Sequence, residues 1–192
     1  MKIAVAGACG RMGRRILELA VVDGLDIGGA FDVPEAAGTA LTVGSESGKP
    51  QAVVMSKNVA EALAGADALI DFTAPAVTLE NVKAAVAAGK PIVIGTTGLS
   101  ETQKAEISAA AATIPIVLAP NMSVGVNLLF KLTSEVAAIL GLDYNVEIVE
   151  VHHNLKKDSP SGTAVRLAER AAEALGLDYA KDTAHGREGI VG

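Results

Sequence analysis

The 192-residue sequence predicts an α/β fold in which a parallel β-sheet is covered by helices on both faces. Two observations along residues 1–120 support this prediction. Short apolar runs alternate with alanine-rich helical stretches, which is the pattern of βαβ units joined by right-handed crossovers. These runs are apolar throughout instead of alternating with polar residues, as expected for strands that are buried on both faces.

The expected strands of this first part are short and mostly apolar: Ile3–Ala6, Asp26–Phe31, Gln51–Met55, Ala68–Phe72, Ile92–Ile94 and Ile116–Ala119. The expected helices lie between them: Arg11–Val22, Val59–Leu63, Ala76–Ala88 and Glu101–Ala112. Gly89 and Pro91 end the third helix, because glycine adopts the left-handed cap conformation and proline cannot continue a helix. Residues 33–50 contain several Gly and Pro and few periodic apolar positions, which predicts a loop or irregular connection.

The pattern changes after Pro120, which predicts a second domain. Its expected elements are a helix, a strand, a polar loop and a second helix: Val124–Leu140, Tyr144–Val151, 152–160 and Ser161–Leu175. Gly141 and Gly176 follow the two helices as end signals. The domains are therefore expected at residues 1–120 and 121–192, the second being a smaller mixed α/β domain.

Composition and charge exclude several classes of function. The chain has a formal net charge of −6 and an isoelectric point near 5.1, whereas a general nucleic-acid binder needs a basic face. Mean hydropathy is +0.39, yet no uninterrupted apolar run approaches the ~18 residues of a membrane-spanning helix. The single Cys9 cannot form an internal disulfide, so we expect a cytoplasmic protein.

The first motif is a glycine-rich loop, Gly-Ala-Cys-Gly-Arg-Met-Gly, at residues 7–13. It follows an expected strand and opens an expected helix, which is the context of a dinucleotide-binding loop. Glycines let the backbone approach a pyrophosphate, and the helix N-terminus offers free amides with a partial positive charge. The alternative is an ordinary glycine turn. Within the loop, Cys9 is interpreted as a small residue chosen for its size, the alternative being a reactive thiol.

Asp32 ends the second expected strand, about 20 residues after the glycine loop, where a carboxylate meets the adenosine ribose. Its alternative role is that of an ordinary residue at the end of a strand. A carboxylate here accepts hydrogen bonds from the 2′-hydroxyl and repels a 2′-phosphate, which favours NADH over NADPH. Arg11 and Arg14 lie nearby in the sequence and could offset this repulsion.

The second motif is a polar cluster at residues 152–163, His-His-Asn-Leu-Lys-Lys-Asp-Ser-Pro-Ser-Gly-Thr. Two His and two Lys within six residues form a local cationic patch that suits an anionic substrate. The Ser-Gly-Thr at the start of the expected helix offers hydroxyls and unpaired amides as a seat for a carboxylate or phosphate. The cluster thus combines a titratable imidazole, an ammonium group and an anion seat, as needed to protonate an acidic small molecule.

Simpler explanations exist for each part of this cluster. A His pair could belong to a metal site, but only His185 remains as a third His, and no Cys pair supports zinc, so no metal is expected. A Lys pair is commonly a solvated surface, and Ser-Gly-Thr could be only a helix cap. The combination with a dinucleotide loop favours the catalytic interpretation.

The motifs together resemble those of the dihydrodipicolinate reductase family. The matching stretches run nearly from end to end: Gly7–Gly13, Asp71–Thr73, Gly95–Gly98, Ala119–Asn127 and Glu150–Thr163. The resemblance implies a Rossmann-like dinucleotide domain followed by a smaller substrate domain. It also implies a homotetramer assembled through the sheet of the substrate domain. The charge and hydropathy of the chain predict no nucleic-acid or membrane partner.

The resemblance also implies residue roles. His152 would donate or accept a proton and Lys156 would donate one. The residues implied for the substrate dicarboxylate are His153, Ser161, Gly162, Thr163 and Thr97. Those implied for the dinucleotide, NADH or NADPH, are Gly7, Ala8, Cys9, Gly10, Arg11, Met12, Asp32, Gly95, Thr96, Thr97, Ala119, Pro120, Asn121 and Met122.

The implied reaction is the reduction of 4-hydroxy-tetrahydrodipicolinate to tetrahydrodipicolinate in lysine and diaminopimelate biosynthesis. Family members continue past the point that corresponds to Gly192, so we expect a C-terminally truncated chain whose substrate-domain sheet is incomplete. One alternative is therefore a non-catalytic or impaired dinucleotide-binding fragment. A second alternative is another NAD(P)-dependent reductase on the same fold.

Overall fold

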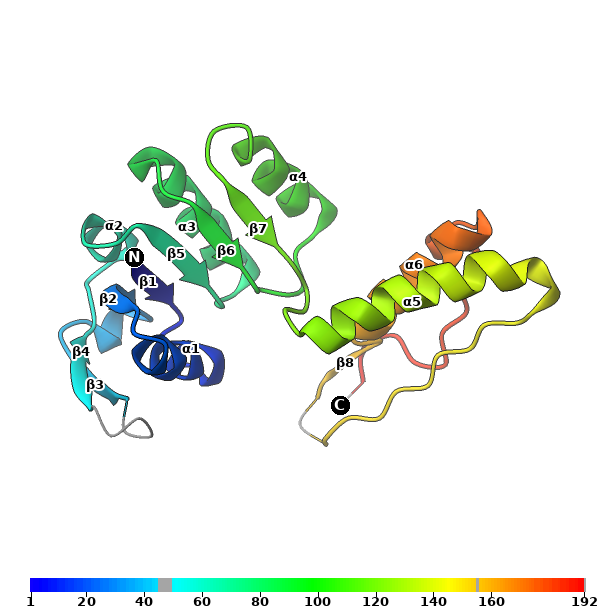
Figure 1. Cartoon of the computed structure of the whole chain (residues 1–192), viewed down its shortest axis with the longest axis horizontal. Helices are drawn as coiled ribbons and strands as arrows, with labels where there is room; N and C mark the ends of the chain where they lie inside the picture. The colour runs from blue at the N-terminus through cyan, green and yellow to red at the C-terminus, as the bar shows by residue number, and fades with distance from the viewer. Residues whose placement is uncertain (45–49, 155, 192) are drawn as a thin grey trace. The chain divides into compact units, whose positions relative to one another are not determined.

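The computed structural model describes residues 1–44, 50–154 and 156–191, with only the backbone of Asp158 (Figure 1). Parts of two predicted loops, residues 45–49 and Leu155, lie outside the described residues. The chain forms two compact units, Met1–Ala119 and Pro120–Gly192.

The first unit is built on a five-stranded sheet with the order β2-β1-β5-β6-β7, in which every neighbouring pair is parallel. The strands are β1 Lys2–Ala6, β2 Asp26–Phe31, β5 Ala68–Asp71, β6 Ile92–Ile94 and β7 Ile116–Leu118. The chain leaves β1 for β2 on one side and later returns to β5 on the other side of β1. This reversal is the topological switch point, at whose carboxyl edge α/β proteins bind ligands.

Helices cover both faces of this sheet, which confirms the predicted α/β class. They are α1 Arg11–Val22, α2 Val59–Ala64, α3 Pro75–Ala88 and α4 Glu101–Ala110. Ile3 and Val5 of β1 pack in one buried cluster with Leu17 of α1. Ala4 and Ala6 point the other way and belong to a second cluster, which includes Leu63 of α2, Val82 of α3 and Ile107 of α4. Burial of both faces is the reason why these strands are apolar throughout.

The predicted irregular connection at residues 33–50 is wrong in part. It contains a short 3-10 helix, η1 Pro34–Ala36, and a strand, β3 Ala40–Val43, which pairs antiparallel with β4 Gln51–Val54. This pair forms a separate two-stranded sheet. Val43 and Val53 are buried in the cluster that contains Leu17 of α1, and this burial stabilises the four-residue strand β3.

The second unit contains two long helices side by side, α5 Val124–Leu140 and α6 Gly162–Leu175 (Figure 1). Both agree with the prediction to within a residue. Gly141 and Gly176 end them with positive φ angles of 65° and 70°. The remaining elements are short: η2 Gly141–Asp143, β8 Asp158–Ser159, α7 Tyr179–Asp182 and β9 Gly189–Ile190. Strands β8 and β9 form an antiparallel pair.

The strand predicted over Tyr144–Val151 is wrong, because the structure shows this segment in no strand. A strand needs a neighbouring backbone to complete its hydrogen bonds, and among the described residues none pairs with this segment. Its alternating apolar side chains stay largely in solvent, with Val149 88% and Val151 91% exposed.

Length and composition alone qualify one stretch of the described chain, Val124–Asp143, as a membrane-spanning helix. It has a mean hydropathy of 1.4 and only 11% of it is buried. Lys131 and Glu135 form an ion pair at 3.7 Å near its middle. Because charged side chains are costly at the centre of a bilayer, this pair argues against a membrane span.

Candidate active site

The glycine loop after β1 makes two backbone approaches that leave no room for a side chain. Gly7 has a φ of +75°, and a Cβ there would overlap the carbonyl oxygen of Phe72. A Cβ on Gly13, in the first turn of α1, would overlap the carbonyl oxygen of Gly7. The loop therefore folds tightly over the end of β1 and brings α1 close to the carboxyl edge of the sheet.

The Asp32 carboxylate holds this loop in place by accepting a hydrogen bond from its backbone. The Cys9 amide donates to Asp32 Oδ2 at 2.7 Å, and the Val33 amide donates to Oδ1 at 2.8 Å. The amides of Gly7 and Ala8 donate to the carbonyl oxygen of Phe31, at 3.0 and 3.2 Å. A carboxylate has about four lone-pair sites, so these two bonds leave Asp32 able to accept from a ribose hydroxyl.

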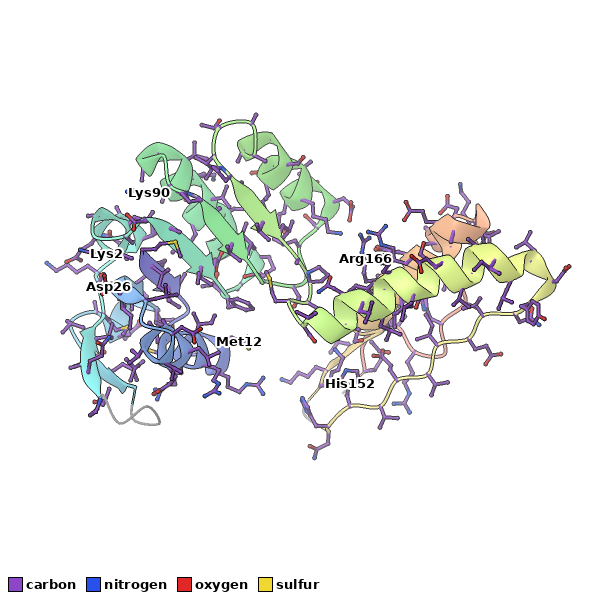
Figure 2. The ribbon with its side chains drawn as sticks, viewed as in Figure 1. Lys2, Met12, Asp26, Lys90, His152 and Arg166 are labelled. Carbon is purple, nitrogen blue, oxygen red and sulfur yellow. The ribbon has the colours of Figure 1, made fainter. Side chains whose placement is uncertain are left out.

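The start of α1 is suited to an anion. Its N-cap residue is Gly10, which has no side chain to satisfy the free amides of the first turn, and this turn holds no acidic residue. Met12 projects from the same turn and is half exposed (Figure 2). The guanidinium of Arg14 donates from Nε to the Cys9 carbonyl oxygen at 3.0 Å, which fixes this side chain against the loop.

Cys9 has the properties of a packing residue. Burial raises the pKa of its thiol, and the negative charge of Asp32 raises it further, while Arg14 lowers it in part. The thiol therefore stays protonated and weakly nucleophilic at neutral pH. This supports the interpretation of Cys9 as a small residue chosen for its size.

Four polar side chains meet where β5 and β6 end. The Thr73 hydroxyl donates to Asp71 Oδ1 at 2.6 Å, and the Thr78 hydroxyl donates to the Thr96 hydroxyl at 2.9 Å. The Thr73 amide donates to the same Thr96 oxygen at 3.0 Å. Asp71, Thr78 and Thr96 are buried, so these bonds fix the turn that leads to Thr97. Burial raises the pKa of Asp71, and the hydrogen bond from Thr73 offsets part of this rise.

Gly95 lies in the same turn but has a purely structural explanation. A Cβ at this position would overlap the ring of Phe72, which packs directly against the backbone. A side chain here would displace the Phe72 ring, so packing favours a glycine whether or not a ligand contacts it.

In the second unit, the start of α6 has the features of the predicted anion seat. The Ser161 hydroxyl caps the helix by accepting from the Ala164 amide at 3.1 Å, and Ser161 itself is buried. A Cβ on Gly162 would meet nothing within 4 Å, so the space in front of this turn is open. The Gly162 and Thr163 amides belong to the first turn, where backbone donors have no intrahelical acceptor. Open space and unpaired donors together suit a carboxylate.

Asn121 connects the start of α5 to this seat. Its Nδ2 donates to the Thr163 hydroxyl at 3.4 Å, and its Oδ1 accepts from the Ser123 amide at 2.9 Å. Asn127, one turn into α5, donates to the carbonyl oxygens of Asn121 and Ser123 at 3.0 and 2.8 Å. Two helix starts are thus joined by side chains that are far apart in the sequence.

Glu150 connects the seat to the histidine segment. The Ser161 amide donates to Glu150 Oε1 at 2.7 Å, and His152 Nδ1 lies 3.5 Å from Glu150 Oε2 (Figure 2 labels His152). Burial raises the pKa of Glu150, but the hydrogen bonds from Ser161 and the positive charges of His152 and Lys156 outweigh this, so the pKa is lowered overall. Glu150 is therefore an ionised acceptor at neutral pH.

The polar loop before α6 is anchored by a later part of the chain. Strand β8 pairs with β9, the Ser159 hydroxyl donates to the Arg187 carbonyl oxygen at 3.1 Å, and the Val191 amide donates to the Lys157 carbonyl oxygen at 2.7 Å. The Lys156 amide also donates to the His153 carbonyl oxygen at 3.2 Å. These bonds connect Lys157 and Ser159 of the loop to the later part of the chain next to the seat.

The structure gathers the predicted site residues into two groups. In the first unit, the glycine loop, Asp32 and residues 95–97 lie at the carboxyl ends of β1, β2 and β6. In the second unit, Asn121 and Thr163 touch, and His152 is linked to Ser161 through Glu150. Thr97 belongs to the first unit and the other predicted substrate residues to the second. Among the described residues, no group of three or more His, Cys, Asp or Glu could hold a metal ion.

Sequence reasoning missed two groups of contributing residues. Glu150 opens the matching stretch Glu150–Thr163, but no role was predicted for it, although it is close to the histidines in the sequence. The Thr73 amide and the Thr78 hydroxyl, which both donate to the Thr96 hydroxyl, were also not predicted. Only the place of Thr73 directly after β5, at the carboxyl edge of the sheet, could have drawn attention to it, whereas Thr78 lies in the first turn of α3.

Comparison with known proteins decides the family. Residues 1–122 match the family profile described as dihydrodipicolinate reductase, N-terminus, and residues 125–190 match dihydrodipicolinate reductase, C-terminus. The chain belongs to the dihydrodipicolinate reductase family. Its relatives include the 4-hydroxy-tetrahydrodipicolinate reductase of Syntrophotalea carbinolica, which is 50% identical over all of this chain and 73% of that relative. The reductase of Geobacter metallireducens is 49% identical over the same shares.

A solved structure shows the same architecture. A dipicolinate-bound dihydrodipicolinate reductase from Paenisporosarcina sp. TG-14 superposes with a TM-score of 0.69 and 27% identity. The match covers 98% of this chain and 70% of the other. The predicted resemblance to the dihydrodipicolinate reductase family is thus confirmed in sequence and in fold.

Proposed function

We propose that the chain reduces 4-hydroxy-tetrahydrodipicolinate to tetrahydrodipicolinate in lysine and diaminopimelate biosynthesis, using a nicotinamide dinucleotide. The observation that carries the proposal is the anion seat at the start of α6, joined through Glu150 to His152. A dicarboxylate substrate needs such a seat, and a reduction needs a proton source next to it. The names of the relatives support the same reaction.

The residues of the first unit fit a dinucleotide. The close backbone approaches at Gly7 and Gly13 leave no side chain between the glycine loop and the start of α1, where a pyrophosphate would meet free amides. The residues proposed to hold the cofactor are Gly7–Met12, Asp32, Gly95–Thr97 and Ala119–Met122. When bound, the reduced nicotinamide supplies the hydride.

Asp32 supports a preference for NADH. Its carboxylate keeps lone pairs for a 2′-hydroxyl but repels a 2′-phosphate. Arg14, which could offset this charge, is fixed on the Cys9 carbonyl. We expect kcat/KM to be higher with NADH, and a clear preference for NADPH would contradict this assignment of Asp32.

The second unit provides the protons and the substrate charges. His152 and Lys156 are proposed to deliver the proton that the reduced carbon skeleton requires. The cation of Lys156 would also stabilise the negative charge that develops during hydride addition. His153, Ser161, Gly162 and Thr163 are proposed to bind a carboxylate. Thr97 is proposed as a further substrate-binding residue.

Kinetics of two variants test this function. We expect His152→Gln and Lys156→Ala each to lower kcat strongly, since a general acid contributes about 10²- to 10⁴-fold. NADH binding, measured by fluorescence titration, should persist in both variants. Unchanged turnover in both would contradict the roles assigned to these residues.

A second candidate function is a dinucleotide-binding protein without reductase activity. It is favoured by the segment 144–151, which pairs with no described strand where the sequence predicts a strand of the substrate domain. Calorimetry separates the two candidates. Binding of both NADH and dipicolinate supports the reductase, whereas binding of NADH alone supports the second candidate.

A homotetramer in the cytoplasm is the proposed state. Support for assembly comes from large apolar side chains that are exposed in the second unit, including Val124, Ile139, Val149 and Val151. Light scattering during gel filtration measures the assembly, and a monomer at micromolar concentration would contradict it. The single Cys9 suits a reducing compartment.

A further inference from the structure

Glu150 occupies a position that neither the family match nor the predicted roles explain. It lies two residues before His152 and eleven before Ser161, in the extended segment that follows η2. One of its carboxylate oxygens accepts from the Ser161 amide at 2.7 Å. The other lies 3.5 Å from His152 Nδ1. A single side chain therefore contacts both halves of the proposed reaction site.

We propose that Glu150 is a positioning residue whose carboxylate holds the His152 ring and the start of α6 as one unit. The proposal rests on the proposed reductase function, in which His152 handles a proton and the start of α6 binds a carboxylate. In this role Glu150 acts through His152 and Ser161, the two residues it contacts.

The contact to His152 selects one ring nitrogen. A carboxylate next to Nδ1 favours a proton on that nitrogen and leaves Nε2 as the atom that faces a substrate. The same negative charge stabilises the imidazolium that a proton donor must form. Without this partner the ring is free to rotate and to change tautomer, because its side chain is 39% exposed.

The contact to Ser161 orients the seat. The amide of an N-cap residue lies outside the helix hydrogen bonds, and Glu150 satisfies it. Ser161 in turn caps the helix through its hydroxyl. Because the Glu150 side chain is only 27% exposed, loss of its carboxylate would leave the partly buried Ser161 amide without an acceptor.

The two contacts can be separated by substitution. Glu150→Gln keeps a side-chain oxygen that accepts from the Ser161 amide but removes the charge next to His152. Glu150→Ala removes both contacts. Glu147→Gln is the matched control, since Glu147 is an exposed residue of the same segment and has no assigned role. Melting temperatures of all three variants report whether each one folds.

We expect Glu150→Gln to lower kcat about 10- to 100-fold, a part of what a general acid contributes. Its calorimetric Kd for dipicolinate should stay within about twofold of wild type, because the Ser161 amide keeps an acceptor. Glu150→Ala should show the same loss of kcat and also bind dipicolinate about tenfold more weakly. Glu147→Gln should match wild type in both measurements. A merely structural role would weaken dipicolinate binding in both Glu150 variants alike, and full kcat in Glu150→Gln would overturn the proposal.

A double-mutant cycle tests whether Glu150 acts through His152. Adding Glu150→Gln to His152→Gln should cause no further loss of kcat, because the residue that Glu150 positions is already gone. Independent, multiplying losses would overturn the proposal.

A measurement that does not depend on turnover tests the role of Glu150 separately from the proposed reductase function. In ¹⁵N-histidine NMR spectra, Glu150→Gln should change the Nδ1 and Nε2 shifts of His152, while those of His185 stay fixed. Unchanged His152 shifts would refute the positioning role even if the wild-type protein is an active reductase. If the wild-type protein binds NADH but has no activity, the proposed function fails, and these shifts together with dipicolinate binding still decide the role of Glu150.

Discussion

Replacement of Gly7 by alanine tests how the glycine loop is built. Gly7 combines two requirements: a φ of +75° and a backbone approach in which a Cβ would lie closer than 3.0 Å to the Phe72 carbonyl oxygen. Gly24 provides the matched control, because its φ is +70° but a Cβ there would meet nothing within 4 Å. The two substitutions therefore share the conformational strain and differ in the close approach.

The expected magnitudes follow from this difference. A left-handed conformation costs an alanine about 1–2 kcal/mol, so Gly24→Ala should lower the free energy of unfolding by about that amount. In Gly7→Ala the loop and Phe72 must also move apart by about 1 Å to reach van der Waals contact. We expect a total loss of about 3–4 kcal/mol, within the range of steric changes in a packed interior.

Cofactor binding separates the two variants further. A shift of the loop away from Phe72 displaces the amides proposed to bind the pyrophosphate. Loss of one hydrogen bond to a charged group costs about 1.5–3 kcal/mol, so Gly7→Ala should weaken NADH binding by about 10- to 100-fold. Gly24→Ala should leave the Kd unchanged.

Urea unfolding and fluorescence titration with NADH measure the two quantities. Equal losses of stability in both variants, together with an unchanged Kd for Gly7→Ala, would refute the reasoning. That result would mean that the loop relaxes without cost and that its position does not decide cofactor binding.

Three further predictions concern a helix cap, a buried acid and a thiol. Ser161→Ala and Ser100→Ala each remove an N-cap hydroxyl and should each lower the free energy of unfolding by about 1 kcal/mol. Only Ser161→Ala should also raise the KM for the dicarboxylate substrate. Equal KM values in the two variants would show that Ser161 is not part of the seat. The folded-state pKa of Asp71 is raised from its ordinary value of 3.8, so the wild type loses stability as pH rises from 3.8 through the raised pKa. Asp71→Asn lacks this loss, and its urea midpoint should improve relative to wild type as pH rises; a difference that does not vary with pH would contradict the buried charge. Because the pKa of Cys9 is raised by burial and by Asp32, its alkylation by iodoacetamide at neutral pH, followed by mass spectrometry, should be slower than that of free cysteine; a faster reaction would indicate an activated thiol.

The elements with local signals were predicted well. Helix α1 and strands β2 and β6 have the predicted bounds, and α5 spans Val124–Leu140 as expected. The apolar periodicity runs along each helix, and the end signals at Gly89, Gly141 and Gly176 directly follow the helices that they end. Such signals act over one or two turns of the chain, so they are readable without knowledge of the fold.

The elements that depend on a distant partner were predicted badly. Strand β3 is formed by its pairing with β4 and by packing against α1, and the segment 144–151 alternates like a strand but pairs with none in the described chain. In both cases the sequence pattern allows a strand, and the presence or absence of a neighbour decides the outcome.

The sequence by itself determined which chemical groups are available: a glycine loop between strand and helix, a carboxylate after the second strand, and a cationic cluster before a helix cap. Only the tertiary structure decided which of them meet. The Cys9 amide reaches Asp32, Asn121 reaches Thr163, and Glu150 joins His152 to Ser161. Such contacts need their two atoms close together, and for residues far apart in the chain that distance is set by strand order and helix packing.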